Sequence, residues 1–285
     1  MSKPGREQDE TGSVQTFARA CKLLRIVAGK KNEGASLSEL VRASGLTKPT
    51  TRRMLIAMIE QGFVEQTRSD SRYYIGVETF SLGVLAASRF GIGAEALKSV
   101  RRLARQSDDA AMLSIRNGNF TTCTHREDGN YPLKTHVLQP GHKHPLGVSA
   151  AGLALLAALP DDEVNSTIEQ NLPRIRQDYP EISEGAVRAE VLATRQRGYS
   201  LNPGLVVSGS WGVAVIVNDV LAARPLALTI AAVQSRFADG RLEQLGKMLL
   251  SERDRLHGIF NREKLPNLIR NSGLSICQED EENAK

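Results

Sequence analysis

Apolar residues recur at helical spacing in three consecutive segments near the start of the chain. Residues 14–29 carry a single apolar stripe and end at a glycine, which favours termination of a helix. Residues 36–45 begin with a serine and a glutamate at capping-box spacing, and residues 47–62 begin with a threonine that can cap a helix. The pattern predicts three helices joined by tight turns.

Two short runs of strand-forming residues, FVEQ and YYIG, follow the third segment and flank the polar stretch TRSDSR. They predict a two-stranded hairpin, and helix, turn, helix and hairpin together make a winged helix-turn-helix. In that arrangement the start of the second helix of the motif enters the major groove of DNA. Its opening, TKPTTRR at residues 47–53, is therefore a candidate DNA-reading surface. The alternative is that these basic residues form an ordinary solvent-exposed helix face without a role in DNA binding.

Residues 77–90 form a fourth helical segment, whose stripe comprises Val77, Phe80, Val84 and Ser88. The spacing is typical of a helix that links two domains. The same stripe could instead be buried within its own chain, and the periodicity leaves both interpretations open.

Beyond residue 90 the pattern changes to helices mixed with alternating strands. An Asn-Gly turn between AAMLSIR and FTTCTHRE predicts one hairpin, PLKTHVLQ predicts a third strand, and SWGVAVIVND with RPLALTIAAV predicts a second hairpin. SAAGLALLAAL, SEGAVRAEVLATRQRG and a final stretch to about His257 predict helices. An antiparallel sheet flanked by helices, an α+β arrangement, is expected.

The second hairpin separates large side chains from small ones, because side chains alternate between the two faces of a strand. The small face comprises Ser210, Gly212, Ala214, Ala227, Thr229 and Ala231. Close packing of the SAAGLALLAAL helix is one explanation of this face. An apolar ligand pocket, with hydroxyls from Ser210 and Thr229, is the other.

Composition and charge favour a two-domain, water-soluble protein of the cytoplasm. The chain has 285 residues and 41% apolar residues, and its three cysteines are far apart in sequence, as expected of reduced thiols. Residues 1–90 hold 14 Lys and Arg against 9 Asp and Glu, whereas the remainder holds 23 of each. The excess positive charge lies wholly in the first part, which favours a polyanionic partner there.

The segment SLSELVRASGLTKPTTRRMLIAMIEQGFVEQ, followed by YYIGVETFSLG, resembles the DNA-binding domain of the IclR family of bacterial transcriptional regulators. The family's reading-helix pattern is matched at Leu46, Lys48, Thr50, Arg53 and Leu55, while Pro49 stands where serine is usual. The resemblance implies DNA contacts from Lys48, Pro49, Thr50, Thr51, Arg52 and Arg53 on the helix and from Arg68 and Arg72 in the hairpin.

HPLGVSAAGLALLAALPDDEV and GSWGVAVIV with PLALTIAA are similar to the effector domain of the same family, which implies a GAF/profilin-like sheet. The implied effector-binding residues are Ala150, Ala151, Asn202, Ser210, Gly212, Thr229 and Ala231. Asn202, Gly212 and Ala231 replace the family's usual aspartate, cysteine and serine, so a larger and less polar site is expected. An aromatic or largely apolar acid is the expected effector.

The resemblance divides the chain into a disordered tail (1–12), a winged helix-turn-helix domain (13–76), a linker helix (77–90), an effector-binding domain (91–262) and a C-terminal tail (263–285). The expected partners are an operator in double-stranded DNA, the small-molecule effector and further copies of the chain, as a homodimer or a dimer of dimers. No membrane partner and no cofactor are expected. Repression or activation depends on where the operator lies relative to the promoter.

Three other functions remain as alternatives. The segment Ser208 to Gly212 approaches a G-x-S-x-G nucleophile elbow but lacks its first glycine, which disfavours an esterase. His142 and His144 have the spacing of two metal ligands without a third, which disfavours a metal-dependent enzyme. A winged helix that binds protein instead of DNA is the third. We expect no catalytic residue and no metal ligand.

Overall fold

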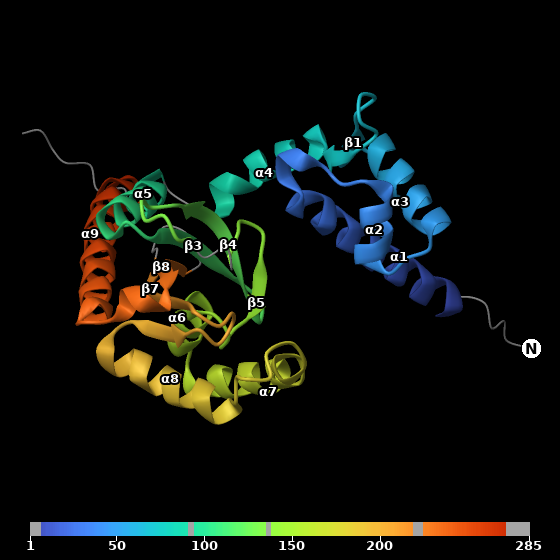
Figure 1. The fold of residues 1–285 in the computed structure, drawn as a ribbon. Helices are drawn as coiled ribbons and strands as arrows, with labels where there is room; N and C mark the ends of the chain where they lie inside the picture. The colour runs from blue at the N-terminus through green and yellow to red at the C-terminus, as the bar shows by residue number, and fades with distance from the viewer. Residues whose placement is uncertain (1–6, 91–93, 135–137, 219–224, 272–285) are drawn as a thin grey trace, which may run out of the picture. The chain divides into compact units, whose positions relative to one another are not determined.

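The computed structural model describes residues 7–90, 94–134, 138–218 and 225–271, and the chain divides into two compact units after Phe90 (Figure 1). None of the helices in these ranges has the length and hydropathy that crossing a membrane demands.

The first unit is a winged helix-turn-helix followed by a helix, as the sequence predicts. Its elements are α1 (Glu7–Gly29), a short 3₁₀ turn (Lys31–Glu33), α2 (Leu37–Ser44), α3 (Lys48–Glu60), β1 (Val64–Gln66), β2 (Tyr73–Ile75) and α4 (Val77–Phe90). Helix α1 begins earlier than predicted, so residues 7–12 are helical although the sequence placed them in a disordered tail. Extending an existing helix needs no new nucleus, which explains why weakly patterned residues can join it.

Local signals fix the ends of α2 in this unit. The Ser36 side chain accepts a hydrogen bond from the Glu39 amide, and the Glu39 carboxylate accepts one from the Ser36 amide, which completes the capping box. At the other end Gly45 has φ of 72°, a left-handed conformation that favours glycine. The turn then leads directly into α3, whose buried Leu55 packs with Leu23 and Leu40 in the unit's core.

The second unit is an antiparallel sheet with helices on both faces. Its strands are β3 (Ala110–Asn117), β4 (Phe120–Glu127), β5 (Lys143–Pro145), β6 (Ser200–Pro203), β7 (Ser210–Val217) and β8 (Leu226–Val233), and its helices are α5 (Ala94–Ser107), α6 (Ala150–Ala157), α7 (Asp161–Asp178), α8 (Glu184–Arg197) and α9 (Arg241–Asn271), with a 3₁₀ turn at Gln234–Phe237. The described strands are ordered β5-β4-β3-β8-β7-β6, and each neighbouring pair is antiparallel.

Large and small side chains separate onto the two faces of β7 and β8 as predicted. Val213 pairs with Ile230 and Val215 pairs with Leu228, and these residues form the main core with α5 and α9. Gly212 pairs with Ala231 on the opposite face, where α6 packs. Figure 1 shows α5 and α9 on one side of the sheet and α6, α7 and α8 on the other.

Two predicted elements differ in the structure. The strand expected at PLKTHVLQ is absent from its described residues, 132–134 and 138–139, while residues 135–137 lie outside the described ranges. Strand β5 at Lys143–Pro145 instead pairs with β4, since Thr121 and His144 are cross-strand partners. Helix α9 extends to Asn271, so residues 263–271 are helical although the sequence placed them in a tail.

Candidate DNA-binding and effector-binding sites

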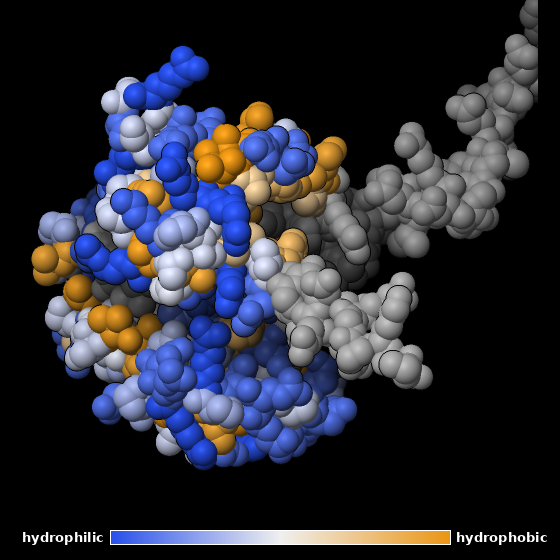
Figure 2. All heavy atoms as spheres, turned by 90° about the vertical axis from the view of Figure 1, so that its right-hand side faces the viewer, coloured by the Kyte–Doolittle hydropathy of each residue, from blue (hydrophilic) through white to orange (hydrophobic). Residues whose placement is uncertain are grey.

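The exposed face of α3 brings together four of the side chains that the sequence analysis selected. Lys48, Pro49, Arg52 and Arg53 are exposed, and with Ile56 they line a shallow hollow. Positions 49, 52, 53 and 56 share one side of a helix because 3.6 residues complete each turn. On the face of the molecule that Figure 2 shows, hydrophilic residues predominate and hydrophobic residues form smaller patches.

Ile56 was missed by sequence reasoning, although 46% of its surface is exposed beside these basic residues. The helical spacing 49, 52, 53 and 56 could have indicated it, because this is the spacing of one helix face. An apolar side chain next to basic ones on this face can contact a thymine methyl group.

The two threonines of the opening lie differently. Thr51 is buried and its hydroxyl donates to the Thr47 carbonyl at 3.0 Å, so Thr51 does not belong to the exposed face of α3. Position 51 lies on the face of α3 that packs into the core, which explains its burial. Thr50 is half-buried, and its hydroxyl accepts a hydrogen bond from the Thr47 hydroxyl at 2.9 Å.

In the wing, Arg68 is exposed near the tip, whereas Arg72 is held by the rest of the unit. The Arg72 guanidinium donates to the Gly34 carbonyl and to a Glu39 carboxylate oxygen, each at 3.1 Å. Hydrogen bonds from Ser36 lower the pKa of Glu39 to about 2, which keeps this carboxylate ionised. Arg72 therefore fixes the wing to α2, and its predicted contact with DNA is secondary to that role.

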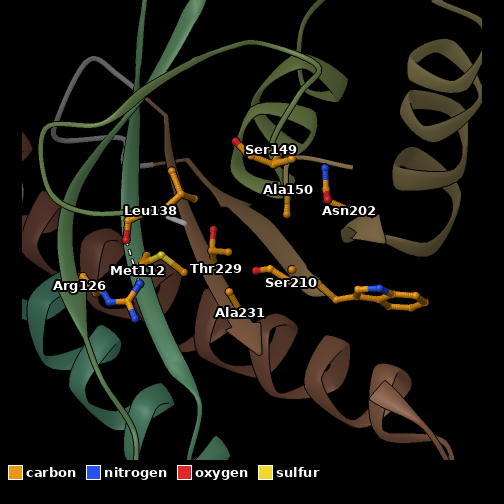
Figure 3. A pocket seen from close by; sticks show the side chains of 12 residues that line it. Met112, Arg126, Leu138, Ser149, Ala150, Asn202, Ser210, Thr229 and Ala231 are labelled. Carbon is orange, nitrogen blue, oxygen red and sulfur yellow. Dashed lines mark hydrogen bonds between the residues drawn. The ribbon is translucent and has the colours of Figure 1, made fainter. Parts of the chain in front are cut away.

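A pocket of the second unit lies on the small face of the sheet, beside the start of α6 (Figure 3). Its empty volume is about 380 Å³, including space open to solvent, and little of this space is wide enough for a water molecule. The pocket is lined by Met112, Arg126, Leu138, Ser149, Ala150, Asn202, Val206, Ser210, Trp211, Gly212, Thr229 and Ala231. Apolar surface predominates, with a few polar groups, as in sites for small organic ligands.

All but one of the residues predicted to bind an effector line this pocket. Ala151 is the exception, because it is fully buried on another side of α6, where it packs with Leu146 and Leu155. Neighbouring residues of a helix point about 100° apart, which explains why Ala150 lines the cavity while the Ala151 side chain is directed into the core. A contact between Ala151 and an effector stays a prediction.

Asn202 lines the pocket, but its side-chain amide is already hydrogen-bonded to backbone groups of the protein. Its nitrogen donates to the Val148 carbonyl at 2.6 Å, and its oxygen accepts from the amides of Gly204 and Leu205 at 3.1 and 3.0 Å. These bonds tie β6 to the segment before α6. Asn202 thus shapes one wall of the pocket.

Thr229 lines the pocket with a buried hydroxyl that makes no hydrogen bond within the described ranges of the structure. The residue is 1% exposed. Ser200, on the same face, is equally buried, yet its hydroxyl donates to the Ala150 carbonyl at 2.7 Å. Buried hydroxyls nearly always have a partner, which for Thr229 can be a water molecule or a polar group of a ligand in the pocket.

Close packing and an open pocket both occur on the small face, at different places. Ala150 and Ala154 of α6 pack against Ala214, which is the predicted close packing. Next to this contact the pocket lies over Gly212, Thr229 and Ala231. A Cβ atom added at Gly212 would lie 3.4 Å from the Ala150 Cβ, an ordinary contact distance. The glycine therefore widens the pocket at its boundary with α6.

His142, His144 and Ser210 are the residues on which the metal-enzyme and esterase alternatives depend. His144 is buried, and its Nδ1 lies 2.9 Å from the Tyr179 hydroxyl. Its pKa is lowered to about 4, mainly by burial and to a smaller extent by electrostatic repulsion from the nearby His142. Within the described ranges no group of three or more His, Cys, Asp and Glu side chains is placed to hold a metal ion. Ser210 begins β7 and lines the pocket.

Six lining residues were not predicted, namely Met112, Arg126, Leu138, Ser149, Val206 and Trp211. Met112 and Arg126 belong to the first hairpin, whose pairing with β8 cannot be deduced from local pattern. The alternation along SWGVAVIV placed Trp211 with the large face, and it does pack on Phe237 there, with ring centroids 5.5 Å apart. A large ring at the end of a strand reaches the pocket as well.

Comparison with known protein families identifies the family of this chain. Residues 16–68 match the IclR helix-turn-helix domain, and residues 84–255 match the C-terminal domain of the bacterial transcriptional regulator IclR. The chain belongs to the IclR family. It is thus an IclR-type transcriptional regulator, with a DNA-binding helix-turn-helix domain and an effector-binding C-terminal domain.

Relatives of this IclR-family chain span most of its length. It is 27% identical to the transcriptional repressor IclR of Escherichia coli over 84% of this chain and 88% of that protein. It is 30% identical to the glycerol operon regulatory protein of Streptomyces griseus over 73% of this chain and 80% of the relative.

Solved structures share the IclR fold. An IclR family regulator from Brucella abortus has a TM-score of 0.65 at 22% identity, covering 90% of this chain and 96% of its own. An IclR homolog from Microbacterium hydrocarbonoxydans, complexed with 4-hydroxybenzoate, has a TM-score of 0.65 at 18% identity, covering 84% and 95%.

Proposed function

We propose that this regulator binds its operator through the exposed face of α3, and that an apolar organic acid bound in the pocket changes the affinity for DNA. The observation that supports an effector most directly is the buried, unbonded hydroxyl of Thr229. It lies on the wall of an otherwise mainly apolar pocket.

The DNA-binding part of the proposal rests on the charge and exposure of α3. Lys48, Arg52 and Arg53 are exposed on one side of this helix, with no acidic residue in its first turn. Lysine and arginine contacts with phosphates position a protein on DNA, while arginine contacts with base edges read the sequence. We assign the base-reading role to Arg52 and Arg53, and phosphate contacts to Lys48 and Arg68.

The proposed effector is an aromatic or largely apolar acid. Ala231, Gly212 and Met112 present apolar surface, and Thr229 offers one hydrogen bond. The Microbacterium homolog complexed with 4-hydroxybenzoate supports this class of ligand. The described pocket is narrow, so we expect Met112 and Leu138 to move when an acid binds. Only a ligand that prefers one of two DNA-binding states can change operator affinity.

The proposed working unit is a homodimer or a dimer of dimers. Val77 and Phe80 of α4 are each 70% exposed, and Val84, Leu85 and the α1 residue Phe17 are exposed as well. An apolar stripe on a helix is seldom left in water, which favours burial against a second copy. Operators with two-fold symmetry also need a protein with matching symmetry. The same exposures show that these side chains are not buried within the first unit itself, which favours a second copy as their partner.

A selection from random duplex DNA with the full-length protein tests the proposal. Enriched sequences should bind with an affinity that falls linearly with salt on logarithmic axes. Adding organic acids should shift this affinity, and Gly212→Ala, whose new methyl group fits beside Ala150, should weaken the shift without weakening DNA binding. Absence of an enriched sequence would contradict the operator proposal, and an affinity indifferent to every acid would contradict the effector proposal.

A further inference from the structure

The pairing of β3 with β4 contains a bulge that decides which face Arg126 occupies. Ser114 pairs with Cys123, but Leu113 pairs with His125, so one residue of β4, Thr124, is extra. The Thr124 hydroxyl donates to the Leu113 carbonyl at 3.1 Å. A bulge of one residue reverses the orientation of every later side chain in its strand.

This reversal places an arginine in the pocket. Arg126 pairs with Met112, which in turn pairs with Thr229, so the three residues form a row across β4, β3 and β8 on one face. Under regular alternation His125 would occupy this position, and Arg126 would lie on the core face beside Ala111. Figure 3 shows Arg126 and Met112 on one side of the pocket, with Thr229 beyond them.

The Arg126 side chain is 5% exposed and already has two protein partners. Its Nε and Nη2 donate to one Asp128 carboxylate oxygen at 2.9 and 2.7 Å, and its Nη1 donates to the Leu138 carbonyl at 2.9 Å. A guanidinium has five N–H groups. The remaining two, one on each terminal nitrogen, have no partner among the residues that the structure describes.

Asp128 neutralises part of the positive charge of Arg126, but its own side chain is partly exposed to solvent. The Asp128 side chain is 36% exposed, and its other carboxylate oxygen lies 4.0 Å from the Lys134 ammonium. Water and the lysine therefore weaken the repulsion between Asp128 and a second carboxylate. The buried guanidinium is less hydrated, so a ligand carboxylate gains more from binding it.

We propose that the carboxylate of the effector binds the Arg126 guanidinium, and that a hydroxyl or keto oxygen of the same molecule bonds to the Thr229 hydroxyl. This inference rests on the proposed effector function and names its ligand class, a compact hydroxy- or keto-acid. Arg126 and Thr229 are two strand spacings apart, about 10 Å between Cα atoms. Met112, Leu138 and Ala231 enclose the apolar body between the two polar ends.

Binding of matched acid and amide pairs to the full-length protein tests this inference. The panel comprises 4-hydroxybenzoate and other small aromatic and aliphatic hydroxy- and keto-acids, each with its primary amide, measured by calorimetry. The acids should bind roughly 10- to 100-fold more tightly than their amides, the range of a charge-assisted hydrogen bond. Arg126→Gln should remove this preference while leaving affinity for the amide unchanged.

Two further variants separate ligand binding from a structural role. Arg101→Gln removes an equivalent charge from an exposed position on α5, outside the pocket, and should change neither affinity. Asp128→Asn removes the competing carboxylate and should tighten acid binding, whereas a purely structural Arg126 would show no such gain. If Arg126→Gln does not fold, Arg126→Lys serves, because lysine keeps the charge but lacks paired N–H groups.

The outcomes distinguish the two proposals. Acids that bind wild type and Arg126→Gln equally well would overturn the role of Arg126 and leave the effector function intact. Acids that bind no more tightly than their amides would also overturn it. If no acid of the panel binds at millimolar concentration, the inference and the effector proposal both fail.

Discussion

Replacing Thr229 by valine should make the second unit more stable and its ligand binding weaker. The Thr229 hydroxyl is buried and has no partner in the described part of the chain. Leaving such a group unsatisfied costs about 1–3 kcal/mol, and valine has the same shape without the polar atom. Thr229→Val should therefore raise the free energy of unfolding by about 1 kcal/mol, the lower end of that range. The loss of ligand affinity should be of similar size.

The assay follows urea unfolding through the fluorescence of Trp211. This is the single tryptophan of the chain and lies in β7, so its signal reports the second unit without contributions from the first. An unchanged slope of the unfolding free energy against urea concentration would show that the substitution has changed stability and not the compactness of the unfolded state. Acid binding is then titrated on the same samples.

Thr121→Val provides the matched control. The Thr121 hydroxyl is likewise buried and unbonded within the described residues, but Thr121 does not line the pocket. The same substitution should therefore stabilise the unit at this position without changing acid affinity. A destabilised Thr229→Val would mean that the hydroxyl is satisfied in the folded protein, and equal effects of both variants on acid binding would refute the assignment to the pocket.

Three further predictions follow from other parts of the molecule. The double variant Arg52→Ala/Arg53→Ala should weaken operator binding by about 1–3 kcal/mol for each base-reading arginine lost, measured by fluorescence anisotropy, and unchanged binding would contradict the role of α3. Phe80→Asp in α4 should sediment as a smaller species than wild type in analytical ultracentrifugation, because it places a charge in the proposed interface. Since the pKa of His144 is lowered to about 4, the unfolded chain binds a proton first, and stability should fall between about pH 6.5 and pH 4. Over this pH range the free energy of unfolding of wild type should fall by on the order of 3 kcal/mol more than that of His144→Gln, as measured by urea unfolding. Equal pH profiles of the two proteins would refute this prediction.

Much of the architecture could be predicted because its signals are local. The capping box of α2 and the left-handed glycine after it lie within a few residues of the helix they delimit. Thr47 stands at the N-cap of α3 as predicted, but its side chain makes no capping hydrogen bond there. Alternation along β7 and β8 likewise separated the core face from the small face. Ser210, Gly212, Thr229 and Ala231 line the pocket for the same reason, whereas Ala150 and Asn202 were expected only from the family resemblance.

Two differences, at Arg72 and at β5, come from contacts between residues distant in sequence. Arg72 is held by Glu39, 33 positions away, so neither residue reveals the ion pair by its neighbours. Thr51 differs for a local reason, because it lies on the helix face already assigned to the core and its hydroxyl donates to the Thr47 carbonyl. Strand β5 forms at Lys143–Pro145 because β4 offers it an edge, which no local pattern records.

The sequence by itself determined the winged helix-turn-helix, the basic face of α3 and the small face of the second hairpin, because hydrogen bonds and side-chain periodicity within a few residues specify them. Only the tertiary structure decided how α6 divides that face into packed and open parts. It alone also turned Arg126 toward Thr229, since one extra residue in β4 reverses the side-chain order. Strand register depends on which pairing buries the most surface across the whole sheet, and that balance is set by the fold.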